Sequence, residues 1–329
     1  MNQMINAELL KLEDVACEIE MGKISKQRAC KVVCDLFNEK NGTNNEPFYY
    51  GGPHDAYACY DGQLDPLGNA RVWYFMDDNS ASGPLGRITC EMATPILLWD
   101  DIPDLQEVVR RLRKAGAKSG AGYNAGVHVH VGAKFDRNGG LTARSTRHLV
   151  NLIASHERLI CDAVSVTPQR QRDWAKFVDP DFLAKINDRA PQTKEELEEM
   201  WYGETGYHRH YDGTRYHLLN LHAIWDKGTI EFRCFEFHNN LHAGELKAWL
   251  QLCMAMVSYA KLMKRSSPER VDASNPKYAM KNWLINMGLA GDEFKTCRKM
   301  LTKHLSGDTA YRVPRGDEDC SAGYYCSLA

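Results

Sequence analysis

Alternating apolar and polar residues predict β-strands at several places along the chain. From Val15 to Met21 every second residue is apolar, and Glu18 and Glu20 occupy positions between them. Because strand side chains point alternately to the two faces of a sheet, both glutamates share one face. Similar patterns predict strands at residues 56–60, 70–76, 88–92, 126–132, 216–224 and 229–237. The turn Asp226-Lys227-Gly228 is expected to join the last two as a hairpin.

A second pattern, with apolar residues three and four apart, predicts helices. In the clearest one Asp101 is the N-cap, Pro103 lies in the first turn and Gly116 marks the end. Further helices are predicted at residues 25–37, 142–166 and 242–263, with a short one after the capping box Thr193/Glu196. Residues 41–55, rich in Gly, Asn and Pro, are predicted to form a loop.

These elements indicate an α+β protein with a curved, mostly antiparallel sheet and flanking helices. We expect a main domain at residues 1–265. Residues 266–329 are expected to form a helical extension packed on it, helical to about Leu305 and irregular afterwards.

Composition narrows the class of protein. The chain is 43% hydrophobic and 26% charged, with a formal net charge of -2, as in ordinary globular proteins. This charge argues against electrostatic binding to nucleic acid. No apolar run reaches the ~20 residues that span a bilayer, and the first residues lack the pattern of a signal peptide. We therefore expect neither nucleic acid nor membrane as a partner.

Eleven cysteines are scattered along the chain, and none forms a C-x-x-C pair. This spacing argues against a structural zinc site. Several cysteines lie within apolar patterns, where a free thiol behaves as a small hydrophobic group. The sequence indicates a reduced, cytoplasmic protein, although a disulfide between Cys320 and Cys326 stays open.

Four predicted strands place ionisable side chains among strongly apolar neighbours. They carry Glu18 and Glu20, Glu91, His128 and His130, and Glu231 and Arg233. Within each pair the members are two residues apart and share a face. Unpaired buried charge costs several kcal/mol, and one arginine with two histidines cannot neutralise four glutamates. Bound divalent cations would neutralise the remaining negative charge. Oxygen-rich ligands with imidazole suit Mg²⁺ or Mn²⁺ better than zinc.

Each pattern also has an ordinary explanation when taken alone. A glutamate pair often lies on a solvated face, and H-x-H on a strand is often structural. An E-x-R pair is commonly a same-face ion pair worth under ~1 kcal/mol. Their joint occurrence in four apolar strands favours a single metal-binding site.

With these residues, the chain resembles the amidoligases, carboxylate–amine ligases related to glutamine synthetase and glutamate–cysteine ligase. The motifs run in order, with gaps, from about Val15 to about Leu305. They are CEIEMGKIS, CEMATPIL, YNAGVHVHVG, RYHLLNLHAIWDKGTIEFRCFEFHNNLHAGELKAW and GLAGDEF. GTIEFR together with the G-x-H-V-H strand is the most specific part. The family's first motif usually begins with Phe-Gly, where this chain has Ala16-Cys17.

The resemblance implies a glutamine synthetase-like catalytic fold that uses ATP and two Mg²⁺ (or Mn²⁺) ions. It implies that Glu18 and Glu20 hold the ions and that Glu91 completes a metal shell. It makes His128 a metal ligand, and Glu231 a ligand of the ion that bridges the ATP phosphates.

Other residues are implied to contact the nucleotide or the substrates. His130 is expected at the ATP phosphates, and Arg233 at the γ-phosphate or the acyl phosphate. Arg215 and Asn220 are weaker candidates for phosphate contact. Asp78 and Ser80 match a D-x-S turn that contacts the acceptor substrate, although a plain β-turn explains them equally well.

The implied reaction begins with attack of a substrate carboxylate on the γ-phosphate, and an amine then displaces phosphate from the acyl phosphate. Two metals, Arg233 and His130 would stabilise the transferred phosphoryl group. A lid must exclude water, and residues 202–214 are the candidate. His208 and His210 are expected to be lid or surface groups rather than metal ligands.

The resemblance also limits the partners without identifying them. The substrates are expected to be a small-molecule or peptide carboxylate and an amine, such as an amino acid, a peptide or a cell-wall precursor. A homo-oligomer fits related folds, and genes of this family often accompany mobile elements or phages.

Two other classes stay open. A metal-dependent hydrolase or oxygenase could use the H-V-H strand. However, a cupin needs a Glu soon after the second His, where residues 133–135 are Ala-Lys-Phe, and an amidohydrolase barrel needs a regular βα repeat. An inactive binding protein on the same fold is the second class. Since the chain has no P-loop motif, ATP would bind through metals and basic groups.

Overall fold

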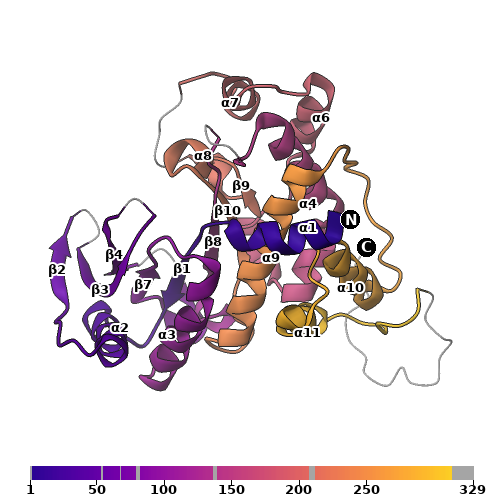
Figure 1. The fold of residues 1–329 in the computed structure, drawn as a ribbon. Coiled ribbons are helices and arrows are strands. Elements are labelled where there is room, and N and C mark those ends of the chain that lie inside the picture. Colours follow the sequence, from indigo (N-terminus) through magenta and orange to yellow (C-terminus); the bar gives the residue numbers. More distant parts are fainter. Residues whose placement is uncertain are drawn as a thin grey trace.

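A central antiparallel sheet organises the computed structural model, which describes residues 2–52, 55–66, 68–78, 82–135, 139–206 and 212–312 (Figure 1). The eight strands are ordered β2-β3-β4-β7-β1-β8-β10-β9, and every neighbouring pair is antiparallel. Their bounds are β1 Val15–Met21, β2 Phe48–Gly51, β3 Ala56–Leu64, β4 Ala70–Met76, β7 Cys90–Ala93, β8 Val127–Gly132, β9 Leu219–Asn220 and β10 Thr229–Phe235. A separate small sheet pairs β5 (Ser82–Gly83) with β6 (Gly86–Arg87). The predicted α+β class with an antiparallel sheet is confirmed.

The helices surround this sheet, and most of them gather beside its β8–β10 end (Figure 1). Their bounds are α1 Asn2–Leu9, α2 Lys26–Asn41, α3 Ile102–Lys114, α4 Ala143–Val164, α5 Pro168–Asp173, α6 Pro180–Arg189, α7 Lys194–Tyr202, α8 Ala223–Asp226, α9 Ala243–Leu262, α10 Pro276–Asn286 and α11 Lys295–Thr302. The predicted helices at 25–37, 101–116, 142–166 and 242–263 all form, with ends shifted by a few residues.

The two faces of the sheet differ sharply in chemistry. Cys17, Val129 and Phe232 lie opposite one another on adjacent strands, and all three are buried. This apolar face packs against helices, for example through Phe235, whose ring stacks 5.1 Å from that of Trp249 on α9. The intervening residues, Glu18 and His128 among them, therefore point to the other face.

Three predictions are corrected by the structure. The expected strand at residues 216–224 pairs only over Leu219–Asn220, because the Asn220 side chain accepts a 2.9 Å hydrogen bond from the His222 amide and the chain then turns into α8. The expected loop at 41–55 contains the edge strand β2. Asp101 does not cap α3; its carboxylate instead accepts from the Leu98 amide and pairs with Arg71.

Some residues named in the sequence analysis cannot be placed. Ser80, His208, His210, Cys320 and Cys326 lie outside the described residues. Among the described helices, none combines the length and apolarity that crossing a membrane requires.

Candidate active site

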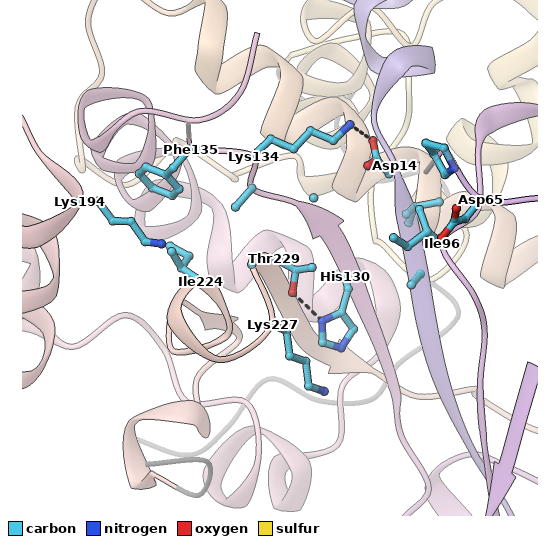
Figure 2. A pocket seen from close by; sticks show the side chains of 16 residues that line it. Asp14, Asp65, Ile96, His130, Lys134, Phe135, Lys194, Ile224, Lys227 and Thr229 are labelled. Atoms are coloured by element: carbon cyan, nitrogen blue, oxygen red, sulfur yellow. Dashed lines mark hydrogen bonds and ion pairs between the residues drawn. The ribbon is translucent and has the colours of Figure 1, made fainter. Parts of the chain in front are cut away.

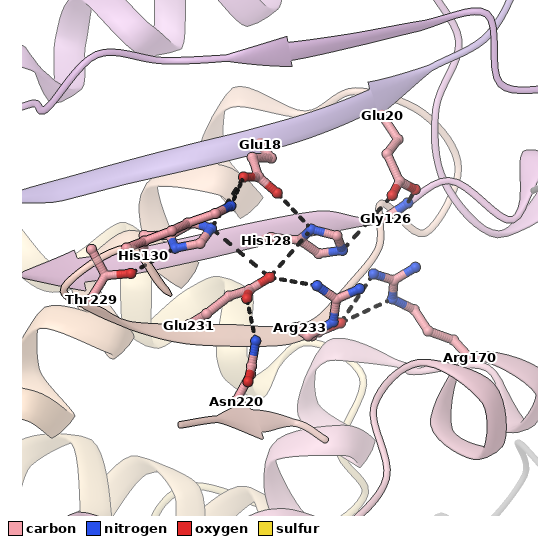
Figure 3. Close-up of polar contacts among 11 residues, drawn as sticks. Glu18, Glu20, Gly126, His128, His130, Arg170, Asn220, Thr229, Glu231 and Arg233 are labelled. Carbon is pink, nitrogen blue, oxygen red and sulfur yellow. Dashed lines mark hydrogen bonds and ion pairs between the residues drawn. The ribbon is translucent and has the colours of Figure 1, made fainter. Parts of the chain in front are cut away.

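The ionisable residues predicted on β1, β8 and β10 lie together on the polar face of the sheet (Figure 3): Glu18, Glu20, His128, His130, Glu231 and Arg233. The strand register explains this. Glu20 of β1 lies opposite Glu91 of β7, and Glu18 lies opposite His128 of β8. Opposed residues of antiparallel strands have Cβ atoms ~5 Å apart, so segments distant in sequence meet at one place.

The first group of potential metal ligands is Glu18, His130 and Glu231, with one ligand atom from each lying within 4.8 Å of the others. The His130 ring is oriented by a 3.0 Å hydrogen bond between Nδ1 and the Thr229 hydroxyl. Its Nε2 is buried and has no hydrogen-bond partner, 3.4 Å from Glu18 Oε1 and 3.9 Å from Glu231 Oε1. A buried imidazole nitrogen facing two carboxylates is a donor set that fits a divalent cation.

His128 connects this group to the rest of the site. Its Nδ1 lies 3.0 Å from Glu18 Oε2, and its Nε2 lies 3.8 Å from Glu20 Oε1 (Figure 3). Burial lowers the pKa of His128, as does the charge of Arg233, while the Glu18 hydrogen bond opposes the shift. The predicted metal ligand His128 therefore lies between the two carboxylates, whereas His130 belongs to the compact group.

The second group is Glu20, Asp78 and Glu91, again with ligand atoms within 4.8 Å of one another. Glu20 is held in place because the Gly126 amide donates a hydrogen bond to its Oε2. The pKa of Glu91 is raised well above its usual range by burial and then by the negative charges of Glu18, Glu20 and Asp78. Crowded carboxylates of this kind favour a bound cation.

Cations border the first group. Arg233 Nη1 donates a 2.6 Å hydrogen bond to Glu231 Oε1, and Lys227 Nζ lies 2.7 Å from Glu18 Oε1. Burial alone would raise the pKa of Glu18, but His130, His128 and Lys227 outweigh it and hold that pKa well below its usual range. Lys227 was not singled out in the sequence, because only the fold brings its turn beside β1.

Arg215 and Arg233 flank the same aromatic ring. Their guanidinium carbons lie 5.9 and 5.7 Å from the ring centroid of Tyr216, which is within cation–π range. Asn220, the weakest of the predicted phosphate contacts, donates a hydrogen bond from its side chain to Glu231 Oε2. Its place opposite Glu231 in the β9–β10 register accounts for this contact.

Arg170 supports the site from behind and was also missed. It is 2% exposed, and its Nε and Nη2 donate to the Arg233 carbonyl oxygen at 3.2 and 3.0 Å. A Cβ atom on Gly126 would lie 1.9 Å from Nη2 of Arg170. The glycine ahead of the V-H-V-H strand is thus the sequence signal of this close packing.

A pocket of about 340 Å³ opens next to the first group (Figure 2). His130, Lys227 and Thr229 form the wall shared with that group, and Phe135 and Ile224 supply apolar surface. Further charged and apolar residues complete the lining, including Asp14, Asp65, Ile96, Lys134 and Lys194. Its size is within the range of small-molecule sites.

Comparisons with known proteins identify a family, and the similar solved structures include a distant one. Residues 14–257 match the model of a family described as "Putative amidoligase enzyme". No curated protein matches the chain. A solved bifunctional glutathione synthetase from Pasteurella multocida is similar with a TM-score of 0.42 and 13% sequence identity. That alignment covers 92% of this chain but 48% of the other, so the chain spans about half of that protein's length.

Proposed function

Because the chain belongs to the amidoligase family, we propose that it joins a carboxylate to an amine with ATP and two Mg²⁺ or Mn²⁺ ions. The observation that carries this proposal is the pair of ligand groups on one sheet face, one of them bordered by Arg233 and Lys227. A site with this charge pattern suits phosphate chemistry, in which cations stabilise oxygens that gain negative charge.

Each ligand group would hold one ion. Glu18, His130 and Glu231 would bind the ion nearer the pocket, since His130 also lines that pocket. Glu20, Asp78 and Glu91 would bind the other. When bound, the ions supply positive charge against the phosphate oxygens.

The pocket beside the first group is our candidate for the nucleotide. Lys227 lies at the shared wall, where a triphosphate would meet both the ammonium group and the metal site. Phe135 and Ile224 offer apolar surface for a purine ring. This arrangement agrees with the absence of a P-loop motif from the sequence.

The proposed reaction has two steps. A carboxylate oxygen of the acid substrate attacks the γ-phosphorus of ATP, the bond to the β-phosphate oxygen breaks, and ADP leaves. The amine nitrogen then attacks the acyl carbon, phosphate departs with the bonding electrons, and the nitrogen loses a proton. Arg233 would bind the phosphoryl oxygens through its planar fork, and Lys227 would neutralise the triphosphate.

Purified protein tests the proposal directly. ADP release is measured with ATP, Mg²⁺ and a panel of carboxylic acids, with hydroxylamine present as a general amine. We expect ADP and a hydroxamate to form together, only with the right acid, and to disappear in excess chelator. ADP release that needs no acid, or that persists without divalent cations, would contradict the proposal.

A further inference from the structure

The polar face that carries the ligand groups continues past β1 to the outer edge of the sheet. In the strand register, Glu18 lies opposite Ala93, Ala93 opposite Tyr74, Tyr74 opposite Ala58, and Ala58 opposite Phe48. Opposed residues share a face, so these five side chains form one row across β1, β7, β4, β3 and β2. At ~4.8 Å per strand the row extends ~19 Å from the first ligand group to the sheet edge.

Four aromatic rings cover the far end of this row, and we call them the outer aromatic face: Phe48, Tyr50, Tyr60 and Tyr74. Phe48 stacks on Tyr60 with ring centroids 5.1 Å apart, and Tyr50 meets Tyr74 edge-on at 4.9 Å. Tyr50 and Tyr60 are 57% and 43% exposed. Exposed clusters of large apolar rings commonly mark binding surfaces.

The opposite side of β4 is covered by α2, whereas Tyr49 of β2 on that side is 61% exposed. Trp73, next to Tyr74 in β4, is fully buried, and its ring lies 5.3 Å from that of Phe37 on α2. The core on the α2 side is therefore formed by contacts with that helix. The aromatic residues on the other side take no part in those contacts. Stability of the core does not explain why the exposed side is aromatic rather than charged.

The row ends at a sheet edge. β2 is the outermost strand and pairs only with β3 among the described residues. The outward backbone groups of an edge strand can pair with an added extended chain, a common mode of peptide recognition. Figure 1 shows β2 at the outer edge of the sheet beside β3 and β4, and these three strands carry the outer aromatic face.

We propose that one of the two substrates is a polypeptide segment that pairs in extended form along the β2 edge, then turns and crosses the outer aromatic face to bring its reacting group to the ligand groups. This inference rests on the proposed function and specifies its substrate class. A single amino acid is much shorter than the row. About six extended residues, in addition to those paired with β2, span its ~19 Å. Uncharged tyrosines accept varied peptide side chains through ring contact and a hydroxyl. An oligosaccharide would also stack on the rings, but it would not pair with the strand edge.

Photo-crosslinking tests the proposal with a defined probe. The probe is a mixed-sequence peptide pool of about ten residues with a benzophenone side chain, and mass spectrometry maps the labelled sites. The variant is Tyr50→Ala/Tyr60→Ala, with Tyr311→Ala as the matched control because Tyr311 is 44% exposed and lies outside the row. We expect labels within residues 48–76 in the wild type and control, and at least tenfold fewer in the double variant.

Thermal unfolding checks that the double variant is folded, and Tyr60→Ser replaces it if it is not. Equal labelling of all variants, labels confined to other regions, or capture of a chito-oligosaccharide probe in preference to peptides would each overturn the proposal. Labelling without ADP release under any condition would contradict the proposed ligase function but would still support peptide binding at this surface. ADP release with free amino acids alone, at the same rate in the double variant, would contradict the peptide substrate and leave the proposed ligase function standing.

Discussion

Arg233 and Glu231 form an ion pair between alternate residues of one strand, with 2.6 Å between Arg233 Nη1 and Glu231 Oε1. Glu231 Oε2 accepts from Asn220, so both carboxylate oxygens have donors. Burial would raise the pKa of Glu231, but Arg233, His130 and His128 outweigh it and lower that pKa to about 2. Glu231 is therefore negatively charged across the physiological range of pH and available to a metal ion.

Replacing Glu231 with Gln keeps the shape of this side chain and removes its charge. We expect ADP release to fall by about 10²-fold or more, because a metal ligand and its charge are lost. Loss of repulsion between Glu231 and Glu18 offsets part of the lost pairing with Arg233, so circular dichroism should show a folded chain. Glu245→Gln is the control, since Glu245 is 9% exposed and lies on α9 away from the site. Full activity in Glu231→Gln would remove that residue from the metal site.

Gly126→Ala should disturb the support behind the site. The added Cβ would overlap the guanidinium of Arg170, which must then move from its two hydrogen bonds to the Arg233 carbonyl. We expect a lower melting temperature and at least tenfold slower ADP release. Gly116→Ala is an informative comparison, because no atom lies within 4 Å of its added Cβ and only backbone strain at φ +102 opposes it. If only the melting temperature falls in Gly126→Ala, the contact is structural and does not position Arg233.

A buried ion pair away from the site makes a prediction about stability. Asp61 is 1% exposed, and its Oδ2 accepts from Arg71 Nε and Nη2 and from Trp73 Nε1. Asp61→Asn leaves Arg71 only partly paired, so we expect a loss of about 3–5 kcal/mol in the free energy of unfolding. Urea titration measures it. Asp104→Asn, which breaks the more exposed pair with Lys40, should cost under ~1 kcal/mol.

Glu157 predicts a pH dependence of stability. Burial raises the pKa of this carboxyl from 4.5 to about 7, against the opposing effects of the Val178 amide and of Arg270 and Arg158. The folded chain thus holds the proton more tightly than the unfolded chain. The protonated Glu157 carboxyl therefore favours the folded chain. Its contribution to the free energy of unfolding is complete below pH 4.5 and is lost as the pH rises through 7.

Glu157→Gln should therefore gain stability relative to the wild type between pH 5 and pH 8, by on the order of 2 kcal/mol. Thermal unfolding across that range measures the difference. Glu107→Gln is the control, since it removes only the exposed pairs of Glu107 with Arg110 and Arg111 and should cost under ~1 kcal/mol. A constant offset between Glu157→Gln and the wild type would mean that the carboxyl does not titrate there.

Much of the site was predictable because strand alternation is a local property. Glu18 and Glu20 had to share a face once β1 was recognised, and the same holds for His128 and His130. Their common pocket depends on strand register, which the alternation alone does not set. The family resemblance, not the alternation, predicted that these strands contribute to one site. In the structure the strand register places Glu18 directly opposite His128.

The residues that were missed have no periodic signal. Lys227 reaches Glu18 across 209 residues of sequence, and Arg170 lies on a short helix whose position depends on tertiary packing. Asp78 was considered for a substrate contact or a plain β-turn, and its place beside Glu20 and Glu91 as a potential metal ligand was not foreseen. The strand error at 216–224 arose because a side chain, Asn220, redirected the backbone where apolar residues suggested continuation.

The order of strands in the sheet bears on how the protein is synthesised. The neighbours β1, β8 and β10 are contributed by residues 15–21, 127–132 and 229–235. A ribosome must therefore translate past residue 235 before the first ligand group has all its members. Prematurely ended chains would lack this group and therefore the ion site that we propose for it.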